Sequence, residues 1–289
     1  KCKEAYRFTI KAGEESKTLT SFQEILRFML EKDFTRTDCV VAIGGGVVGD
    51  LAGFVAASFM RGIDFYNIPT TLLSQIDSSI GGKTGVNLDH VKNIVGAFYQ
   101  PKGVLIDPAT LRTLDERQIR SGMAEAIKIA AVFDADFFKY LEERDLNEPF
   151  ENIIQPCLHL KRMVVEQDEK EKGLRKTLNF GHTVGHAIEV NSNLTHGESV
   201  AVGMTYFIHP DLRPRLLKVL EKYNLPTQTN LPVDVLMGTL RHDKKAEGAN
   251  VTIVKVEKLG QFKLEKVSLE EIESYLNNFS LESKNKETL

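Results

Sequence analysis

Three histidines and one glutamate have the residue types and spacing of a divalent metal site. His182 and His186 are four residues apart and therefore share one face of a helix. His196 begins the next expected helix, close enough to fold back toward the first two. Glu125 lies within an otherwise apolar helical segment, where a buried carboxylate must be paired or metal-bound. Two histidines, a glutamate and an open position are the pattern of catalytic zinc. The alternative is that one or two of these histidines are ordinary surface or core residues.

A glycine-rich turn, Gly44–Asp50, follows an apolar strand and opens a helix. Its glycines allow close backbone approach, and the helix N-terminus offers free N–H groups to a phosphate. The turn fits the G-x-G-x-x-G pattern of dinucleotide-binding proteins. The acid that should bind the ribose does not fit, because Asp64 has the spacing but precedes its strand. The turn indicates a nucleotide bound in a variant of the motif. The alternative is a bare strand–helix turn that needs small residues.

A second polar, glycine-rich stretch runs from residue 70 to residue 85. Its Gly-Gly-Lys-Thr sequence resembles a P-loop, but Asp77 stands where that loop needs glycine, which excludes an NTPase of this class. The Asp77 carboxylate and the Lys83 ammonium remain, followed by Lys92 and Asn93. The alternative is a solvated loop, but the density of hydroxyls and glycines favours a functional role.

Further cations could hold a doubly anionic substrate such as a phosphorylated acid. Each alone is ordinarily a solvated surface charge, except Lys128, which lies one turn after Glu125 on the same helix. The whole set is Lys83, Lys92, Lys128, Lys161, Arg175, Lys244 and Lys245.

The elements that position these residues change character along the chain. The first part alternates expected strands and helices, which is typical of an α/β domain with a parallel sheet. The apolar run at 39–43 indicates a buried strand, with Cys39 in the core. Strands are expected at 6–10, 39–43, 65–68 and 104–107, and helices at 22–29 and 48–60.

After about residue 114 the chain is expected to be mainly helical. We therefore expect an α/β domain over 1–116 and a helical domain over 117–289. Helices are predicted at 121–132, 135–144, 151–167, 177–190, 198–208, 212–223, 233–241 and 269–279, and short strands at 251–256 and 261–264.

The composition excludes several classes of protein. With 289 residues, 42% of them hydrophobic and 27% charged, the chain has the make-up of a soluble globular protein. No apolar run reaches the ~20 residues of a membrane span. The net charge of −3 argues against nucleic-acid binding. Cys2, Cys39 and Cys157 are odd in number and scattered, so we expect neither a disulfide framework nor a CxxC metal site, and a reducing cytoplasm.

Together these motifs resemble the 3-dehydroquinate synthase family of sugar-phosphate cyclases. The resemblance implies a Rossmann-like NAD-binding α/β domain, a helical metal-binding domain and a homodimer. It implies the conversion of 3-deoxy-D-arabino-heptulosonate 7-phosphate to 3-dehydroquinate and phosphate, in the shikimate pathway. That reaction comprises transient oxidation at C5 by NAD, β-elimination of phosphate, reduction, ring opening and an aldol closure. The resemblance runs in order through residues 12–245 and is carried by Gly44–Asp50, Pro69–Thr71, Asp77–Thr84, Lys92–Phe98, Ser121–Lys128, Leu178–Glu189 and His196–Met204.

The same resemblance assigns roles to individual residues. It implies that Glu125, His182 and His196 bind Zn²⁺ or Co²⁺. In the segment Gly13–Lys17 it implies that Glu14 holds the adenosine ribose, which explains why Asp64 does not fit. The implied substrate positions are His186, Lys83, Lys128, Asn93, Asp77, Lys161, Arg175, Asn179 and one of Lys244 and Lys245, with Arg61 entering the neighbouring subunit's site. The implied NAD contacts are Glu14, Lys17, Gly46, Val47, Val48, Gly49, Asp50, Thr70, Thr71, Lys83, Lys92, Thr110, Leu111, Arg112 and Thr113.

Two departures from the family pattern and three rival functions stay open at this stage. The family has a further β-α segment before residue 1, and its chain between Met204 and Leu225 is longer, with no proline like Pro210 in the helix. We therefore expect residues to be missing at both places.

A sibling cyclase that makes 2-deoxy-scyllo-inosose or valiolone would not need Arg175 and Asn179 for a carboxylate. A metal-dependent polyol dehydrogenase would produce net NADH, and a non-catalytic binding protein would turn over nothing.

Overall fold

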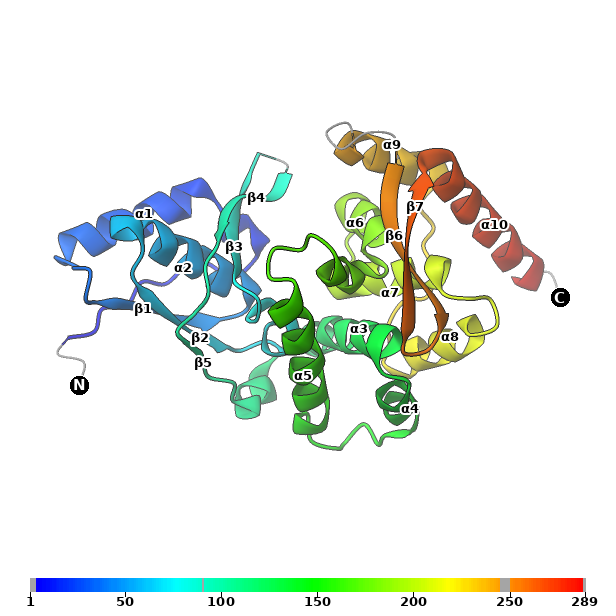
Figure 1. Ribbon diagram of the computed structural model, residues 1–289, viewed down its shortest axis with the longest axis horizontal. Helices are drawn as coiled ribbons and strands as arrows, with labels where there is room; N and C mark the ends of the chain where they lie inside the picture. Colours follow the sequence, from blue (N-terminus) through cyan, green and yellow to red (C-terminus); the bar gives the residue numbers. More distant parts are fainter. Residues whose placement is uncertain (1–3, 90, 245–249, 288–289) are drawn as a thin grey trace. The chain divides into compact units, whose positions relative to one another are not determined.

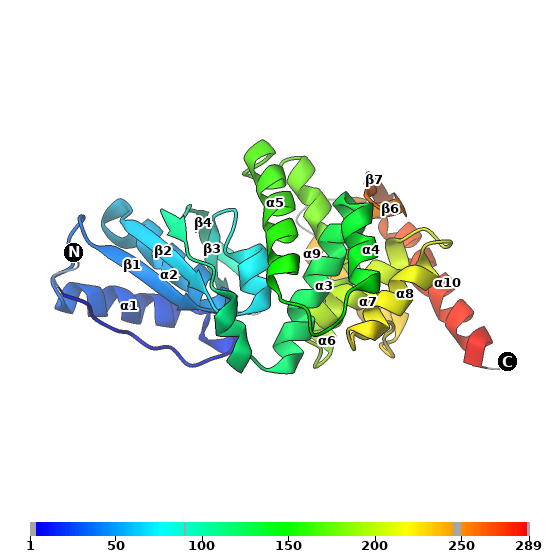
Figure 2. The same cartoon turned by 90° about the horizontal axis from the view of Figure 1, so that it is seen from below.

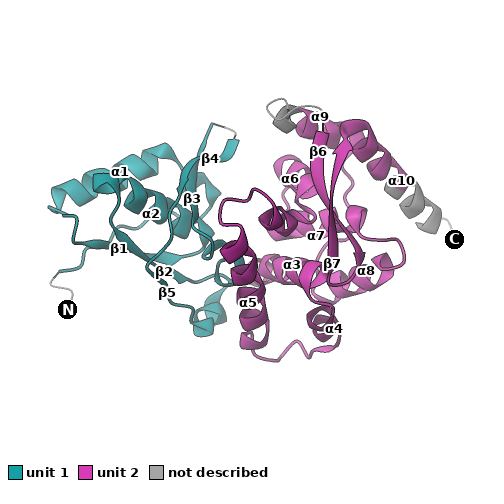
Figure 3. Ribbon diagram, in the orientation of Figure 1, with its two compact units in different colours: residues 1–115 teal, residues 116–289 magenta. Residues whose placement is uncertain are grey.

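The computed structural model describes residues 4–89, 91–244 and 250–287. The chain divides into two compact units, Lys1–Asp115 and Glu116–Leu289 (Figure 3). The first combines a parallel sheet with helices and the second is mainly helical, so the expected fold class is confirmed.

The first unit is built from short strands and helices that follow one another closely. They are η1 (Glu14–Ser16), α1 (Leu19–Glu31), β1 (Cys39–Gly44), α2 (Gly46–Ser58), η2 (Phe59–Arg61), β2 (Asp64–Pro69), the π-helical turn η3 (Ser74–Ser78), β3 (Lys83–Leu88), β4 (Val91–Phe98), β5 (Gly103–Val104) and η4 (Pro108–Thr113). The parallel sheet has the strand order β1-β2-β5. Helix α2 packs on this sheet, on α1 and on β3 (Figures 1 and 2), and it is apolar nearly all round because it is covered on several sides.

The strand at 39–43 exists, but it is only half buried. Of its residues only Ala42 is buried, whereas Val41 and Ile43 are 50% and 63% exposed. Cys39 is exposed as well, so its expected place in the core is wrong. The reason is that α2 covers one face of the sheet, while side chains of β1 that point to the other face stay open to solvent.

The expected strand at 6–10 is wrong, because the described residues there form no strand. The aromatic side chains of this segment instead pack on α1 and the residues after it. The ring of Phe8 lies 5.3 Å from that of Phe28, and the ring of Tyr6 lies 6.2 Å from that of Phe34. Contacts with a helix therefore replace the strand pairing that the alternating pattern predicted.

The antiparallel hairpin of β3 and β4 was not expected from the sequence. Its strands pair Lys83 with Phe98 and Gly85 with Gly96, with an irregularity between Val86 and Leu88. Glycines and polar residues obscure the alternation that normally reveals a strand.

The strand expected at 104–107 is shorter in the structure, where β5 covers Gly103–Val104. Asp107 instead caps the turn that follows, by accepting a hydrogen bond from the Ala109 N–H group.

The second unit is a helical body with one antiparallel hairpin. Its elements are α3 (Glu116–Phe133), α4 (Ala135–Glu143), α5 (Glu151–Gln167), η5 (Leu174–Asn179), α6 (His182–Asn191), α7 (His196–Phe207), α8 (Arg213–Lys222), α9 (Val233–Lys244), β6 (Asn250–Lys258), β7 (Gln261–Ser268) and α10 (Leu269–Glu287). Helix α7 is buried from Gly197 to Phe207 and contacts α3, α6, α8, α10 and β6 (Figure 1). It is therefore the central helix of this unit. In the part of the chain that the structure describes, no helix is long and apolar enough to cross a membrane.

The helix predicted at 177–190 is broken at Gly181, which has a φ of +80°. This left-handed conformation suits glycine, and it separates η5 from α6. It also lets the backbone of Gly181 approach α7, where a Cβ atom on Gly203 would lie 2.0 Å from the Gly181 carbonyl oxygen. The two helices consequently pack with their backbones almost in contact.

The stretch from Met204 to Leu225 contains the end of α7, a short turn at 208–212 and α8. Ile208 forms a parallel bridge with Val256, and the His209 N–H group donates to the Val256 carbonyl oxygen at 2.8 Å. Pro210 lies in the turn between the two helices, where a missing N–H group costs no helical hydrogen bond.

A test of the α6–α7 packing is the substitution Gly203→Ala. We expect the free energy of unfolding to fall by about 1–3 kcal/mol, because the added methyl group must push the two backbones apart. Gly238→Ala is the matched control, since Gly238 lies inside α9 with open space around its Cα atom. That variant should be slightly more stable, by about 0.5–1 kcal/mol. Urea denaturation measures both, and equal stabilities would contradict the packing described here.

Candidate functional site

The centre of the second unit's candidate site is the carboxylate of Glu125 on α3. Its side chain is fully buried, with 0% exposure. One oxygen, Oε2, accepts a hydrogen bond from the Lys128 ammonium one turn further along α3, and Lys128 is itself 1% exposed. The other oxygen, Oε1, is buried and has no hydrogen-bond partner among the described residues. A buried anionic oxygen without a partner is costly, so this atom indicates a position that suits a cation.

Two histidines direct ring nitrogens at that oxygen. The Nε2 atoms of His182 and His196 lie 3.7 Å and 3.4 Å from Glu125 Oε1. Their Nδ1 atoms are occupied elsewhere: that of His182 lies 3.2 Å from the Phe180 carbonyl oxygen, and that of His196 lies 3.0 Å from Glu189 Oε2. Each Nδ1 therefore carries the proton it donates, which leaves the Nε2 atom of each ring as the one that can bind a metal when it carries no proton.

The helix starts explain why these nitrogens converge. His182 is the first residue of α6 and His196 the first of α7. A capping box fixes the start of α7, in which the Thr195 side chain accepts from the Glu198 N–H group and the Glu198 carboxylate accepts from the Thr195 N–H group. Arg117, near the start of α3, donates to both carboxylate oxygens of Glu198 at 2.7–3.1 Å.

The close contact of α3 with α7 brings the turns that carry Glu125 and His196 together. The Gly197 N–H group donates to the Ser121 hydroxyl at 3.0 Å, one turn before Glu125 on α3. A Cβ atom at Gly197 would lie 2.0 Å from the Ser121 carbonyl oxygen. Only glycine after His196 therefore allows α7 to start this close to α3.

The charges at this centre match those that a metal ion requires. Burial alone would raise the pKa of Glu125, but Lys128 and the two histidines hold that pKa well below its usual range. Burial and the nearby Lys128 charge lower the pKa of His182 well below its usual value, so that ring is neutral. Burial also opposes the charged form of His196, yet the carboxylates of Glu125 and Glu189 outweigh it and raise the pKa of His196 to about 9, so a metal ion would take the place of the proton on Nε2.

The donor set of Glu125, His182 and His196 fits a divalent metal. One ligand atom from each lies within 4.8 Å of the others, and the unpartnered Oε1 atom belongs to this set. Imidazole and carboxylate ligands suit Zn²⁺ and Co²⁺. His186, which is exposed, belongs to a second group of possible ligands with Glu189 and His196, and its ring lies 5.2 Å from that of His182.

Three of the expected anion-binding residues lie on elements that contact one another in this unit. Lys161 on α5 and Arg175 on η5 are 6% and 2% exposed, and Asn179 ends η5. The Arg175 guanidinium donates to the Glu169 carbonyl oxygen. Asn179 Nδ2 donates to Glu171 Oε1 at 2.7 Å. These hydrogen bonds hold Arg175 and Asn179 in place.

The loop before η5 is organised by Asp168. Its carboxylate accepts hydrogen bonds from the backbone N–H groups of Lys172, Gly173 and Arg175 at 2.7–2.9 Å. Hydrogen bonds from the backbone, with the Arg175 N–H group first among them, lower the pKa of Asp168. Glu171 in this loop has a φ of +56°, and the sequence analysis singled out neither Asp168 nor Glu171.

In the first unit the glycine turn lies beside the end of β2. Gly44 pairs with Pro69 across the sheet, and the Thr70 N–H group donates to the Gly44 carbonyl oxygen at 2.9 Å. Among the residues that the structure describes, no side chain caps the start of α2, so its first N–H groups can bind a phosphate. This fits a nucleotide at the carboxyl ends of the parallel strands.

Gln75 joins the two expected NAD-contact segments that follow β2 and β5. Its side chain is fully buried, and Nε2 lies 3.0–3.1 Å from the carbonyl oxygens of Pro69 and Asp107 and from the Thr110 hydroxyl. The segment at 70–71 is consequently tied to the segment at 110–113. Sequence analysis missed Gln75, because a buried glutamine in a polar stretch looks like any loop residue.

A buried lysine connects two further residues expected at the nucleotide and substrate positions. The Lys17 ammonium lies 2.5 Å from Asp50 Oδ2 and 2.5 Å from Asn93 Oδ1, and Lys17 is 4% exposed. Asn93 has a φ of +55°, and its N–H group donates to Asn87 Oδ1. Asn87 Nδ2 donates in turn to Glu14 Oε1 at 2.8 Å. A polar network therefore joins η1, α2 and the β3–β4 hairpin.

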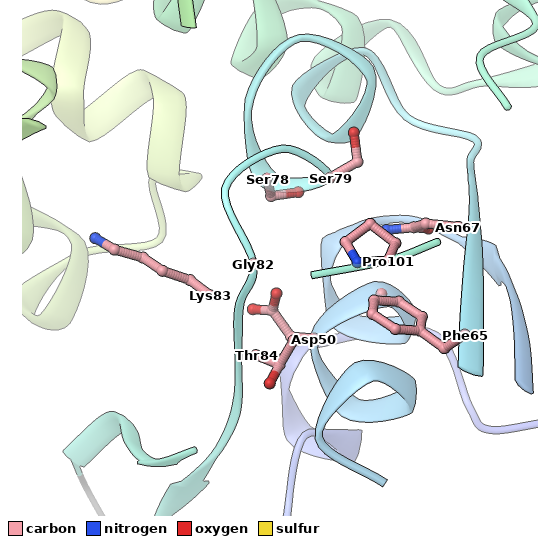
Figure 4. A pocket seen from close by; sticks show the side chains of 10 residues that line it. Asp50, Phe65, Asn67, Ser78, Ser79, Gly82, Lys83, Thr84 and Pro101 are labelled. Carbon is pink, nitrogen blue, oxygen red and sulfur yellow. The ribbon is translucent and has the colours of Figure 1, made fainter. Parts of the chain in front are cut away.

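A small pocket in this unit is lined by Asp50, Ser78 and Ser79, with Lys83 extending away from Asp50 (Figure 4). Asp77 lies in η3 and Arg61 in η2, where Arg61 is exposed and has a φ of +67°. The structure places these residues but assigns them no ligand. The side chains of Lys244 and Lys245 lie outside the described residues.

A test of the charge balance at Glu125 is the substitution Lys128→Met. In metal-free protein it leaves a buried carboxylate without its cation, so the free energy of unfolding should fall by about 3–5 kcal/mol. Lys139→Met is the control, because Lys139 forms an exposed pair with Glu143 at 3.9 Å. That change should cost less than about 0.5 kcal/mol. The measurement is urea denaturation in the presence of a chelator, and a loss as small as the control's would refute the pairing.

Comparison with known proteins relates both units to one family. Residues 7–121 match the family model for the 3-dehydroquinate synthase N-terminal region, and residues 122–246 match the model for its C-terminal region. The 3-dehydroquinate synthase of Enterococcus faecalis is 47% identical over 285 residues, which cover 93% of this chain and 80% of that protein.

Solved structures of sugar-phosphate cyclases have a similar fold. The 2-epi-5-epi-valiolone synthase ValA of Streptomyces hygroscopicus, with NAD⁺ and Zn²⁺ bound, gives a TM-score of 0.85 at 28% identity, covering 94% of this chain and 82% of ValA. A 2-deoxy-scyllo-inosose synthase in complex with carbaglucose-6-phosphate, NAD⁺ and Co²⁺ gives a TM-score of 0.79 at 27% identity, covering 91% and 80%. Since the two family models span most of the sequence and the bacterial relative is nearly half identical, the chain belongs to the 3-dehydroquinate synthase family.

Proposed function

We propose that this protein converts 3-deoxy-D-arabino-heptulosonate 7-phosphate to 3-dehydroquinate and phosphate, as an NAD- and metal-dependent lyase of aromatic amino acid biosynthesis. Its relative of the same activity is 47% identical over 93% of the chain. The observation that carries the proposal is the position of His182 and His196 beside the buried Oε1 atom of Glu125. That oxygen has no hydrogen-bond partner in the described structure.

We assign NAD to the first unit and Zn²⁺ or Co²⁺ to the second. NAD would accept and return a hydride, and the metal would polarise substrate oxygens and lower the pKa of a hydroxyl. The glycine turn, Lys17 and Asp50 would hold NAD, together with the segments at 70–71 and 110–113 that Gln75 ties together. ValA and the inosose synthase carry NAD⁺ with Zn²⁺ or Co²⁺, which supports the assignment.

The chain's own side chains would handle the substrate's charges and protons. Arg175 and Asn179 suit a carboxylate, because a guanidinium and an amide N–H group both donate hydrogen bonds to its oxygens. Buried Lys161 suits the phosphate, whose loss it would favour by stabilising the departing dianion. His186, beside the metal ligands and exposed, is placed to take or give a proton at a substrate hydroxyl.

We further propose a cytoplasmic homodimer. The sequence has three scattered cysteines with no CxxC pair, which suits a reducing compartment. Arg61 is exposed in η2 in a left-handed conformation, and we assign it to the neighbouring subunit's substrate site. Sedimentation velocity tests the dimer.

The decisive experiment measures phosphate release from 3-deoxy-D-arabino-heptulosonate 7-phosphate together with 3-dehydroquinate formation. We expect release that requires both NAD and a divalent metal, with no net NADH, and its loss in Glu125→Gln. Release only from a substrate without a carboxylate would make the protein a sibling cyclase. Net NADH from a polyol would make it a dehydrogenase, and either result would overturn the proposal.

The role of Lys161 is tested by comparing neighbouring substitutions on α5. Lys161→Met should lower kcat/KM by roughly 10- to 150-fold, because it removes one charge-assisted hydrogen bond worth about 1.5–3 kcal/mol. Arg162→Met is the control, since Arg162 is 74% exposed and pairs with Glu166 on the same helix. Steady-state kinetics should show no more than about a twofold change for the control. Equal effects of the two substitutions would remove Lys161 from the substrate site.

A further inference from the structure

We propose that Glu189 is a positioning residue that orients His196 for metal binding, an inference that rests on the proposed metal site. Glu189 lies near the end of α6, seven residues after His182 and three after His186. These spacings put all three side chains on one face of the helix. The residue that Glu189 contacts, however, is on the next helix.

The imidazole of His196 bridges two carboxylates through opposite ring atoms. Its Nδ1 atom lies 3.0 Å from Glu189 Oε2, and its Nε2 atom lies 3.4 Å from Glu125 Oε1. A carboxylate accepts hydrogen bonds, so Nδ1 must carry the proton in this contact. Glu189 thus selects the tautomer whose Nε2 lone pair points to the metal position.

The two expected histidine ligands are oriented in different ways. The His182 ring is 12% exposed, and its Nδ1 atom faces the carbonyl oxygen of Phe180, a backbone group. The His196 ring is 31% exposed and stands at the first residue of α7, so packing restrains it less. Its Nδ1 partner is a side chain that is 15% exposed and reaches across from α6. His196 is therefore the ligand whose orientation depends on a residue that mutation can remove.

Glu189 also contributes charge without occupying the metal. A carboxylate behind a histidine ligand makes the ligating nitrogen more basic and fixes its ring plane. The arrangement gives the site one carboxylate in direct contact with the metal position, Glu125, and a second behind His196. Losing such an outer partner typically weakens metal binding 10- to 100-fold.

The test measures Zn²⁺ binding to the metal-free full-length protein by competition with a chromophoric chelator. We expect Glu189→Ala to raise the Kd by roughly 10- to 100-fold. Glu189→Gln keeps an acceptor for Nδ1 but loses the charge, so its Kd should lie between those of wild type and Glu189→Ala. Glu143→Ala is the control, as Glu143 is 69% exposed on α4, and its Kd should match wild type.

A second readout separates positioning from general stability. The visible absorption of the Co²⁺-loaded protein reports the ligand geometry, and we expect it to shift in Glu189→Ala although the circular dichroism spectrum of the metal-free variant matches wild type. An unchanged Kd and spectrum would overturn the proposal. Binding of two Zn²⁺ ions by wild type and one by Glu189→Ala would also overturn it, because Glu189 would then be a ligand of a second ion with His186.

Failure of this inference is distinguishable from failure of the metal site itself. Glu125→Ala should abolish Zn²⁺ binding if the proposed function is right. If Glu125→Ala binds Zn²⁺ like wild type, the metal site is wrong. If Glu125→Ala loses Zn²⁺ and Glu189→Ala does not, only the role of Glu189 is wrong.

Discussion

The buried negative charge of Glu125 is the constraint on which the second unit depends. A carboxylate with 0% exposure destabilises the folded state unless cations and hydrogen-bond donors surround it. Lys128 supplies one cation from the same helix, and His182 and His196 turn ring nitrogens toward the remaining oxygen. The starts of α6 and α7 must therefore lie beside Glu125 on α3.

Tight backbone packing is what allows the helices to meet. Gly197 lets the start of α7 approach Ser121 on α3, and Gly203 lets α7 approach the Gly181 turn before α6. Arg117 and Glu198 then join the starts of α3 and α7 through a bidentate ion pair. Several of these residues are neighbours in sequence of the proposed metal ligands, so the same contacts support the fold and the proposed site.

In the first unit a polar network connects residues that are expected to bind NAD. Lys17 contacts Asp50 and Asn93, while Gln75 links the end of β2 to the turn that follows β5. Both side chains are buried, so their donors are fixed before a ligand binds. Preorganised donors of this kind lower the entropic cost of binding a charged cofactor.

Local patterns in the sequence determined much of this protein. The spacing of His182, His186 and His196, the lone carboxylate in the apolar segment at 121–132 and the glycine turn after an apolar strand all predicted features that the structure contains. The helices also followed from periodicity, because one buried face repeats every 3.6 residues whatever the partner.

Only the tertiary structure decided which faces are buried and which polar groups meet. The segment at 6–10 alternates like a strand but packs on α1, and Cys39 lies in an apolar run yet is exposed. The β3–β4 hairpin, Gln75 and the contact of Glu189 with His196 had no local signal. The physical reason is that pairing and burial depend on partners far away along the chain, whereas helical periodicity depends on neighbours a few residues apart.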